Sequence, residues 1–288
     1  MIQQANAIET LLADLIDYAG LFPPAALDTP VALANYRAYA QSNHAQALGR
    51  FVIDLPRISE LLNAAPRALQ QIRISLVAPP DFDPGALGRL LDQGLRIESV
   101  EIKADTPVQI EALARNLPAS CMIYFEVPIH PQSYSLLDTI AAVCARAKLR
   151  LGGVVADAFP ATHPVAEMLQ ALADRHIAFK ATAGLHHPLR ARHPLTYAMD
   201  SPTGCMHGFI NLLCATAILF DGGDAEDACR ILNEENSATF RLTADTLRWN
   251  DHKFSADLLR SVREHCLTSI GSCSFTEPIH DLETLGWL

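Results

Sequence analysis

Short apolar runs recur along the chain, and longer segments with apolar residues at helical spacing separate them. The strand-like runs occupy residues 50–55, 72–79, 99–104, 122–127, 149–156 and 177–184. The intervening helical patterns occupy residues 58–71, 85–94, 107–117, 133–147 and 164–176. This alternation predicts a parallel sheet with crossover helices, and the nearly continuous apolar strands indicate burial on both faces of the sheet.

The two ends of the chain extend this pattern. We expect helices at 8–18, 29–41, 208–220, 225–235 and 255–265, a hairpin at 239–250, and strands both after His207 and at 268–272. These elements predict an α/β fold, a (β/α)₈ TIM-type barrel with an N-terminal helical extension. A doubly wound sheet is disfavoured because no G-x-G-x-x-G follows the first strand. We expect one domain over residues 1–288, with a helical segment at 1–48 and irregular last barrel units at 205–288.

Composition and charge narrow the classes of function. Half of the 288 residues are hydrophobic, and the net charge of −10 comes without a run of Lys and Arg. This charge argues against nucleic acid or an anionic membrane as a partner. Seven cysteines without a C-x-x-C pair, and an N-terminus without a signal pattern, favour a cytoplasmic protein. A small-molecule substrate is the expected partner, and a homo-oligomer is compatible with the sequence.

Several polar side chains lie at or near the ends of the expected strands, where barrel enzymes place their active sites. Period-two alternation places on the inward faces Asp54, Glu101, Lys103, Tyr124, Glu126, Lys180 and Thr182. A structural alternative is that Lys103 forms a buried ion pair with Glu101 or Glu126.

Lysine is scarce in this sequence, and its placement is informative. Of four lysines, Lys103 and Lys180 end apolar strands, whereas Lys148 and Lys253 are expected in a helix and a loop. A desolvated lysine, or one near a second cation, loses basicity and becomes a nucleophile toward carbonyls. With Glu126 and Asp54 as proton carriers, this pattern predicts a lyase that forms a Schiff base with a small polar or anionic carbonyl compound and needs no cofactor.

The segment "FKATAGL" resembles the Lys-Thr-Ser-(Thr/Ala)-Gly-Phe segment of class I aldolases of the deoxyribose-phosphate aldolase type. In that group the segment carries the Schiff-base lysine at the end of the sixth barrel strand, and the following strand carries a second lysine. The resemblance implies that Lys180 is the nucleophile and that Gly184 opens the turn after it. No lysine lies on the next expected strand, so Lys103 is the candidate second lysine.

Histidines after the same strand support a different hypothesis. His186, His187 and His207 could converge with Glu126 or Asp157 on a divalent metal, as in metal-dependent barrel hydrolases, lyases or isomerases. The spacing lacks H-x-H and H-E-x-x-H, and these histidines are also compatible with a helix cap, turns or direct substrate binding.

Other residues are candidates for binding an anion. Arg190 and Arg192 could each bind a carboxylate or phosphate through two parallel hydrogen bonds from the guanidinium group. Gly271 and Ser272 end the last strand, where barrels often bind anions through backbone N–H groups. The alternative to an enzyme is a non-catalytic barrel that binds a small ligand.

Overall fold

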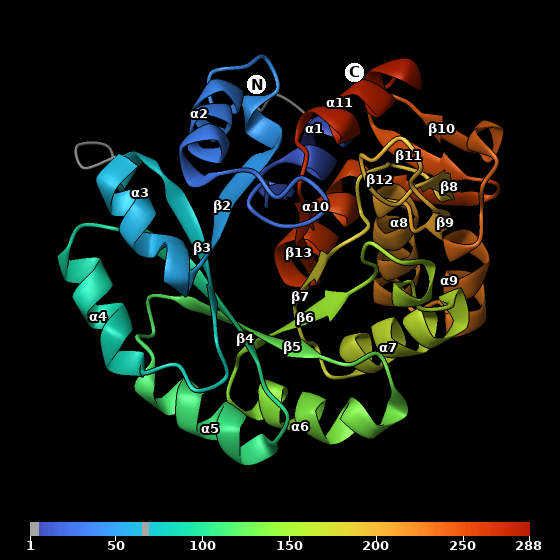
Figure 1. The fold of residues 1–288 in the computed structure, drawn as a ribbon. Helices are drawn as coiled ribbons and strands as arrows, with labels where there is room; N and C mark the ends of the chain where they lie inside the picture. The colour runs from blue at the N-terminus through green and yellow to red at the C-terminus, as the bar shows by residue number, and fades with distance from the viewer. Residues whose placement is uncertain (1–5, 65–68) are drawn as a thin grey trace, which may run out of the picture.

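The computed structural model describes residues 6–64 and 69–288. Eight parallel strands close into a barrel in the order β1-β13-β7-β6-β5-β4-β3-β2, and helices surround it (Figure 1). The predicted (β/α)₈ barrel is therefore confirmed. Its strands are β1 (Ile16–Tyr18), β2 (Leu48–Asp54), β3 (Arg73–Ala78), β4 (Arg96–Lys103), β5 (Met122–Val127), β6 (Arg146–Arg150), β7 (Phe179–Thr182) and β13 (Leu267–Ser272).

The outer layer consists mainly of helices that follow the strands in the chain. These helices are α1 (Ala7–Leu12), α2 (Thr29–Tyr39), α3 (Ile58–Ala64), α4 (Pro84–Asp92), α5 (Pro107–Asn116), α6 (Tyr134–Ala142), α7 (Thr162–Asp174), α8 (Phe209–Phe220), α9 (Ala225–Leu232), α10 (Ala256–His265) and α11 (Thr276–Thr284). Almost the whole of α8 is buried against α7, α9 and α10, as expected for a helix that is apolar on all sides. No described helix is long and apolar enough to cross a membrane.

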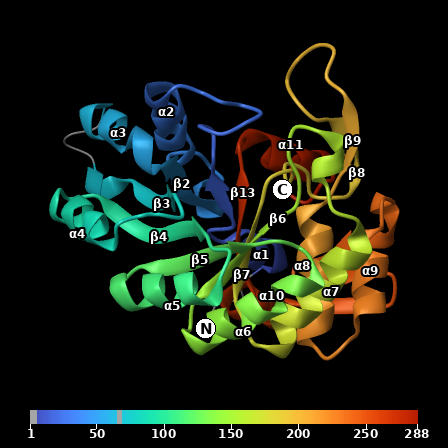
Figure 2. The ribbon, with the colours of Figure 1, turned by 60° about the horizontal axis from the view of Figure 1, so that its bottom comes forward.

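Two small antiparallel sheets lie outside the barrel. The hairpin of β8 (Ala191–Pro194) and β9 (Thr203–Met206) projects beyond the helices near α11 (Figure 2). The expected hairpin at 239–250 is confirmed by β10 (Phe240–Leu242) and β11 (Thr246–Trp249), to which β12 (His252–Ser255) adds a third strand.

The barrel closes at the N-terminus, which differs from the expectation. The helix expected over 8–18 ends at Leu12, and Asp14 adopts a left-handed φ of 50° before β1 begins. β1 pairs with both β13 and β2. No barrel strand follows His207 in the described residues before α8 begins, so the strand expected there is wrong. The nearest strand, β9, precedes His207 and pairs only with β8 in the described residues. The N-terminal segment thus contributes a barrel strand as well as helices.

A second difference concerns β6. Helix α6 ends at Ala142, and Cys144 has a left-handed φ of 53°, so the chain turns earlier than the helical pattern over 133–147 predicts. β6 therefore starts at Arg146 and includes Lys148, which is not helical. Since β1 is the first barrel strand, Lys180 lies on the seventh strand and Lys148 on the sixth.

The position of β1 between β13 and β2 predicts a measurable stability effect. Ile16 is fully buried, so Ile16→Ala should lower the free energy of unfolding by about 2–5 kcal/mol. Val108→Ala on α5, where the valine is 73% exposed, should change it by less than about 0.5 kcal/mol. Urea unfolding of the two variants measures both values. Equal stabilities would contradict a closing role for β1.

Candidate active site

A buried ionic network crosses the centre of the barrel. The Lys180 ammonium on β7 lies 2.6 Å from Asp17 Oδ2 on β1 and 2.6 Å from Glu101 Oε1 on β4. The other oxygen of Glu101 lies 2.8 Å from the Lys148 ammonium on β6, and Lys148 lies 2.9 Å from Glu126 on β5. The network therefore joins five of the eight strands.

Hydrogen bonds from small polar groups complete the network. Ser75 donates to Glu101 over 2.6 Å, Ser269 donates to Asp17 over 2.8 Å, and the Arg50 backbone N–H donates to Asp17 over 2.7 Å. Burial alone would raise the pKa of Glu101, but Lys148 and Lys180 outweigh it and lower that pKa. Each oxygen of the Glu101 carboxylate thus contacts an ammonium group, and Glu101 remains ionised.

The surroundings of Lys180 stabilise its charged form, whereas the prediction that Lys180 is a nucleophile requires surroundings that favour the neutral amine. Burial would lower the pKa of its ammonium, but Asp17 and Glu101 outweigh this effect and raise the pKa. Its side chain is only 1% exposed and does not line the cavity at the barrel mouth. Lys180 is therefore a charged, enclosed group that lies outside the cavity lining.

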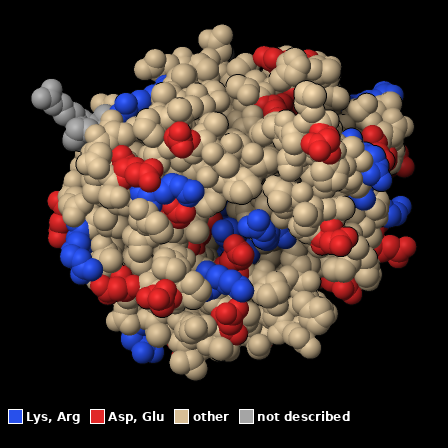
Figure 3. Space-filling model, in the orientation of Figure 1, with Lys and Arg blue, Asp and Glu red and all other residues tan. Residues whose placement is uncertain are grey.

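A cavity of about 200 Å³ opens at the carboxyl ends of the strands. Its charged lining side chains are Glu101, Glu126, Lys148, Arg150 and His186. Figure 3 shows basic and acidic side chains together around a hollow near the centre of the face seen in Figure 1. Lys148 thus combines contact with the cavity and a place in the buried network. Burial would lower its pKa, but Glu101 and Glu126 outweigh burial and raise it.

Some residues expected at the site line this cavity, and others do not. Glu126, Thr182, His186 and Gly271 do. Lys103 is 57% exposed at the outer end of β4 and lies 3.7 Å from Asp105, so it pairs with neither Glu101 nor Glu126. Asp54 pairs instead with Arg57 at 2.6 Å.

The remaining candidates do not line the cavity and have partners of their own. His187 contacts Asp281 over 2.6 Å, Arg190 contacts Glu235 over 3.3 Å, and His207 lies 2.8 Å from the Pro160 carbonyl oxygen. Arg192 on β8 donates to Thr203 on β9. Gly184 has a left-handed φ of 69°, as its turn position requires.

His186 lies within a polar cluster at the end of β13. Its Nδ1 is 3.2 Å from Glu277 and 3.3 Å from the Ser272 hydroxyl, and the Cys273 sulfur lies 3.8 Å away. Burial would lower the pKa of His186, but Cys273 and Glu277 raise it to about 9. The imidazole therefore carries a positive charge at neutral pH at the wall of the cavity.

The three histidines of the metal hypothesis have different partners. His186 contacts Glu277 and Ser272, His187 contacts Asp281, and His207 contacts the Pro160 carbonyl oxygen. Among the described residues, no group of three or more His, Cys, Asp or Glu side chains is arranged to hold a metal ion.

The sequence interpretation missed three charged residues. Asp17 follows an apolar run in "LIDYAG" much as Asp54 does in "FVIDLP", but the run was assigned to a helix. Lys148 and Arg150 alternate with leucines in "KLRL", a period-two signal. Lys148 was assigned to the preceding helix, and Arg150 lay in the expected strand over 149–156 but was not singled out. Asp17 joins the network, and the other two line the cavity.

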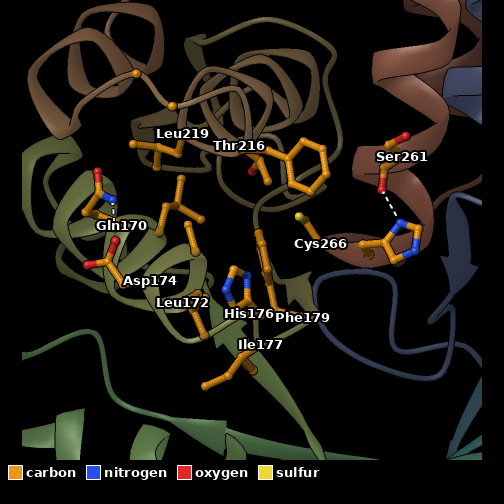
Figure 4. Close-up of a pocket in the computed structure, with 16 residues that line it drawn as sticks. Gln170, Leu172, Asp174, His176, Ile177, Phe179, Thr216, Leu219, Ser261 and Cys266 are labelled. Carbon is orange, nitrogen blue, oxygen red and sulfur yellow. Dashed lines mark hydrogen bonds between the residues drawn. The ribbon is translucent and has the colours of Figure 1, made fainter.

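A larger hollow of about 640 Å³ lies elsewhere, between α7, α8 and α10 (Figure 4). It is lined mostly by apolar side chains and includes Phe179 and Ile177, at and just before the amino end of β7. Barrel enzymes react at the opposite end of the strands. We therefore place the candidate active site at the smaller, charged cavity.

No model of a known protein family matches this chain, and no curated protein sequence matches it significantly.

Removing the central cation should destabilise the fold. Lys180→Met leaves Asp17 and Glu101 buried with one fewer positive partner, and the expected loss is about 3–5 kcal/mol of unfolding free energy. Lys103→Met at the exposed end of β4 should cost less than about 0.5 kcal/mol. Denaturant unfolding compares them, and a Lys180→Met protein as stable as the parent would contradict the structural role of this ammonium.

The raised pKa of His186 predicts a pH-dependent stability. Above pH 6.5 the unfolded chain has lost this proton, whereas the folded protein keeps it up to about pH 9. The stabilisation from protonated His186 is therefore complete below pH 6.5 and is lost between pH 6.5 and about 9, with a slope of at most about 1.4 kcal/mol per pH unit. Unfolding measured across this window should show a smaller decline for His186→Gln, and identical slopes would contradict the assignment.

Proposed function

We propose that this protein is an enzyme of the class I aldolase type, a carbon–carbon lyase that forms a lysine Schiff base with a small polar or anionic carbonyl compound in the barrel cavity. We assign the Schiff base to Lys148. The observation that carries this proposal is a pair of lysines, Lys148 and Lys180, that lie opposite each other on neighbouring strands and share Glu101. Of the two, Lys148 lines the cavity.

The proposal keeps the strand positions that the aldolase resemblance implies but moves the nucleophile away from the segment that carries the resemblance. The resemblance implies a nucleophile on the sixth barrel strand and a second lysine on the next strand. Lys148 occupies the sixth strand, β6, and Lys180 occupies the seventh, β7. The "FKATAGL" segment then carries the supporting lysine, and the nucleophile lies in "KLRL".

The nucleophile must first lose a proton, because Glu101 and Glu126 raise the pKa of Lys148. Glu101 is held by Ser75 and Lys180, whereas Glu126 is 25% exposed and contacts Lys148 over 2.9 Å. Glu126 is therefore the group that takes the proton when substrate displaces water from the cavity. The fixed charge of Lys180 offsets the negative charge of Glu101, which favours release of this proton.

The reaction then follows ordinary imine chemistry. The neutral Lys148 amine attacks the carbonyl carbon and forms a carbon–nitrogen bond, and protonated Glu126 gives its proton to the former carbonyl oxygen. Loss of that oxygen as water, which also carries off one amine proton, leaves the protonated imine. The imine accepts the electron pair of the bond between the α and β carbons and becomes an enamine, while Glu126 takes the proton of the β-hydroxyl, whose carbon leaves as a carbonyl compound. Return of that proton to the α carbon and addition of water then release the second product and Lys148.

Borohydride trapping tests the assignment directly. Incubation with small aldehydes and oxo acids, followed by borohydride, should leave a stable mass adduct on the peptide that contains Lys148. Lys148→Arg keeps the positive charge but cannot form an imine, so it should lose both the adduct and the activity while the thermal unfolding transition is retained. Lys253→Arg on β12 is the matched control and should retain the adduct.

Each alternative has its own result in this experiment. An adduct on Lys180 would support the original assignment from the resemblance and would overturn ours. Loss of activity after chelation, with recovery on adding zinc or manganese and with no adduct on any lysine, would favour a metal-dependent enzyme that uses His186, His187 and His207. Ligand binding without an adduct or turnover would favour a non-catalytic binding barrel.

A further inference from the structure

Arg150 is a second cation of the cavity, and the proposed Schiff-base role does not use it. It follows Lys148 by two residues on β6, so both side chains point to the same face of the strand, about 7 Å apart along it. Both line the cavity. Arg150 thus lies one step nearer the opening than Lys148.

The guanidinium of Arg150 has no counterion in the described residues. Lys148 and Lys180 each contact two carboxylates, whereas Arg150 forms neither an ion pair nor a side-chain hydrogen bond in residues 6–64 and 69–288. Its side chain is exposed and also lines an adjoining hollow that contains Glu126 and Asp157, yet neither of these carboxylates is within ion-pair distance. An arginine at a cavity wall therefore retains its full capacity to bind an anion.

The neighbouring strands supply a compatible wall. Arg150 pairs in register with Thr182 on β7, and Thr182 pairs with Gly271 on β13; all three line the cavity. Among the described residues, the Thr182 hydroxyl makes a single hydrogen bond, a long one of 3.5 Å to the Leu149 carbonyl oxygen. A Cβ at position 271 would lie 3.0 Å from the Thr182 methyl group, so glycine leaves this wall open.

We propose that Arg150 and Thr182 bind the carboxylate of the substrate and thereby select short-chain oxo acids over neutral carbonyl compounds. This inference rests on the proposed function, because the carbonyl is then directed inward to Lys148. The planar guanidinium fork matches a carboxylate in two parallel hydrogen bonds. A single guanidinium in a cavity of about 200 Å³ fits this small planar anion better than a bulkier phosphate.

A matched pair of aldehydes tests the selection. Glyoxylate and glycolaldehyde both have two carbons and an aldehyde, and only glyoxylate carries a carboxylate. In borohydride trapping, half-maximal adduct should form at an about tenfold lower concentration of glyoxylate than of glycolaldehyde, the size expected for hydrogen bonds to a charged group. Arg150→Gln should remove this preference and leave trapping of glycolaldehyde within about twofold.

Arg115→Gln, at an exposed arginine on α5, is the control and should keep the preference. Equal trapping of the two aldehydes by the parent protein, or a preference that survives Arg150→Gln, would overturn the proposal. Stronger trapping of glycolaldehyde phosphate than of glyoxylate would overturn the choice of a carboxylate.

A binding measurement separates this proposal from the Schiff base. Lactate carries a carboxylate but no carbonyl, so calorimetric titration with lactate reports anion binding without chemistry. Binding that weakens about tenfold in Arg150→Gln, in a protein that forms no adduct with any aldehyde, would support the anion site and reject the Schiff base. Lactate binding unchanged by Arg150→Gln would reject the anion site.

Discussion

The barrel depends on a buried ammonium group held between two carboxylates. Desolvating a lone charge costs several kcal/mol, so Lys180 is tolerated only because Asp17 and Glu101 each lie 2.6 Å away and are themselves hydrogen-bonded. These three residues come from the seventh, first and fourth barrel strands. The interaction therefore ties the short N-terminal strand β1 to the opposite wall of the barrel, in addition to its backbone pairing with β2 and β13.

The same interaction sets the polarity of the cavity. The inner layer contains three carboxylates, Asp17, Glu101 and Glu126, against the two ammonium groups of Lys148 and Lys180. The next layer outward contains the guanidinium of Arg150, which has no ion-pair partner in the part of the chain that the structure describes. In the proposed function, the oxo acid therefore binds with its carboxylate outward and its neutral carbonyl inward, toward Lys148.

Much of this arrangement follows from local pattern. Period-two alternation correctly placed Glu101, Glu126 and Lys180 inside the barrel, because these residues lie within long apolar runs. Alternation did not reveal Asp17, because a strand of three residues is too short to show a period. In addition, β1 forms through pairing with β2 and β13, and β13 is distant in sequence. Alternation did not place Lys148 on a strand, because the end of α6 depends on the left-handed backbone of Cys144, which apolar periodicity does not reveal.

Choosing between two lysines requires access as well as charge. Carboxylates raise the pKa of both Lys148 and Lys180, so basicity alone does not single out a nucleophile. The two differ in their neighbours: Lys180 contacts two carboxylates that are almost fully buried, whereas Lys148 also contacts Glu126, which is 25% exposed. A proton on Lys148 can therefore leave through a group that reaches solvent, and the freed amine faces a cavity. A proton on Lys180 has neither route, so the proposed function treats Lys180 as a fixed positive charge and Lys148 as the nucleophile.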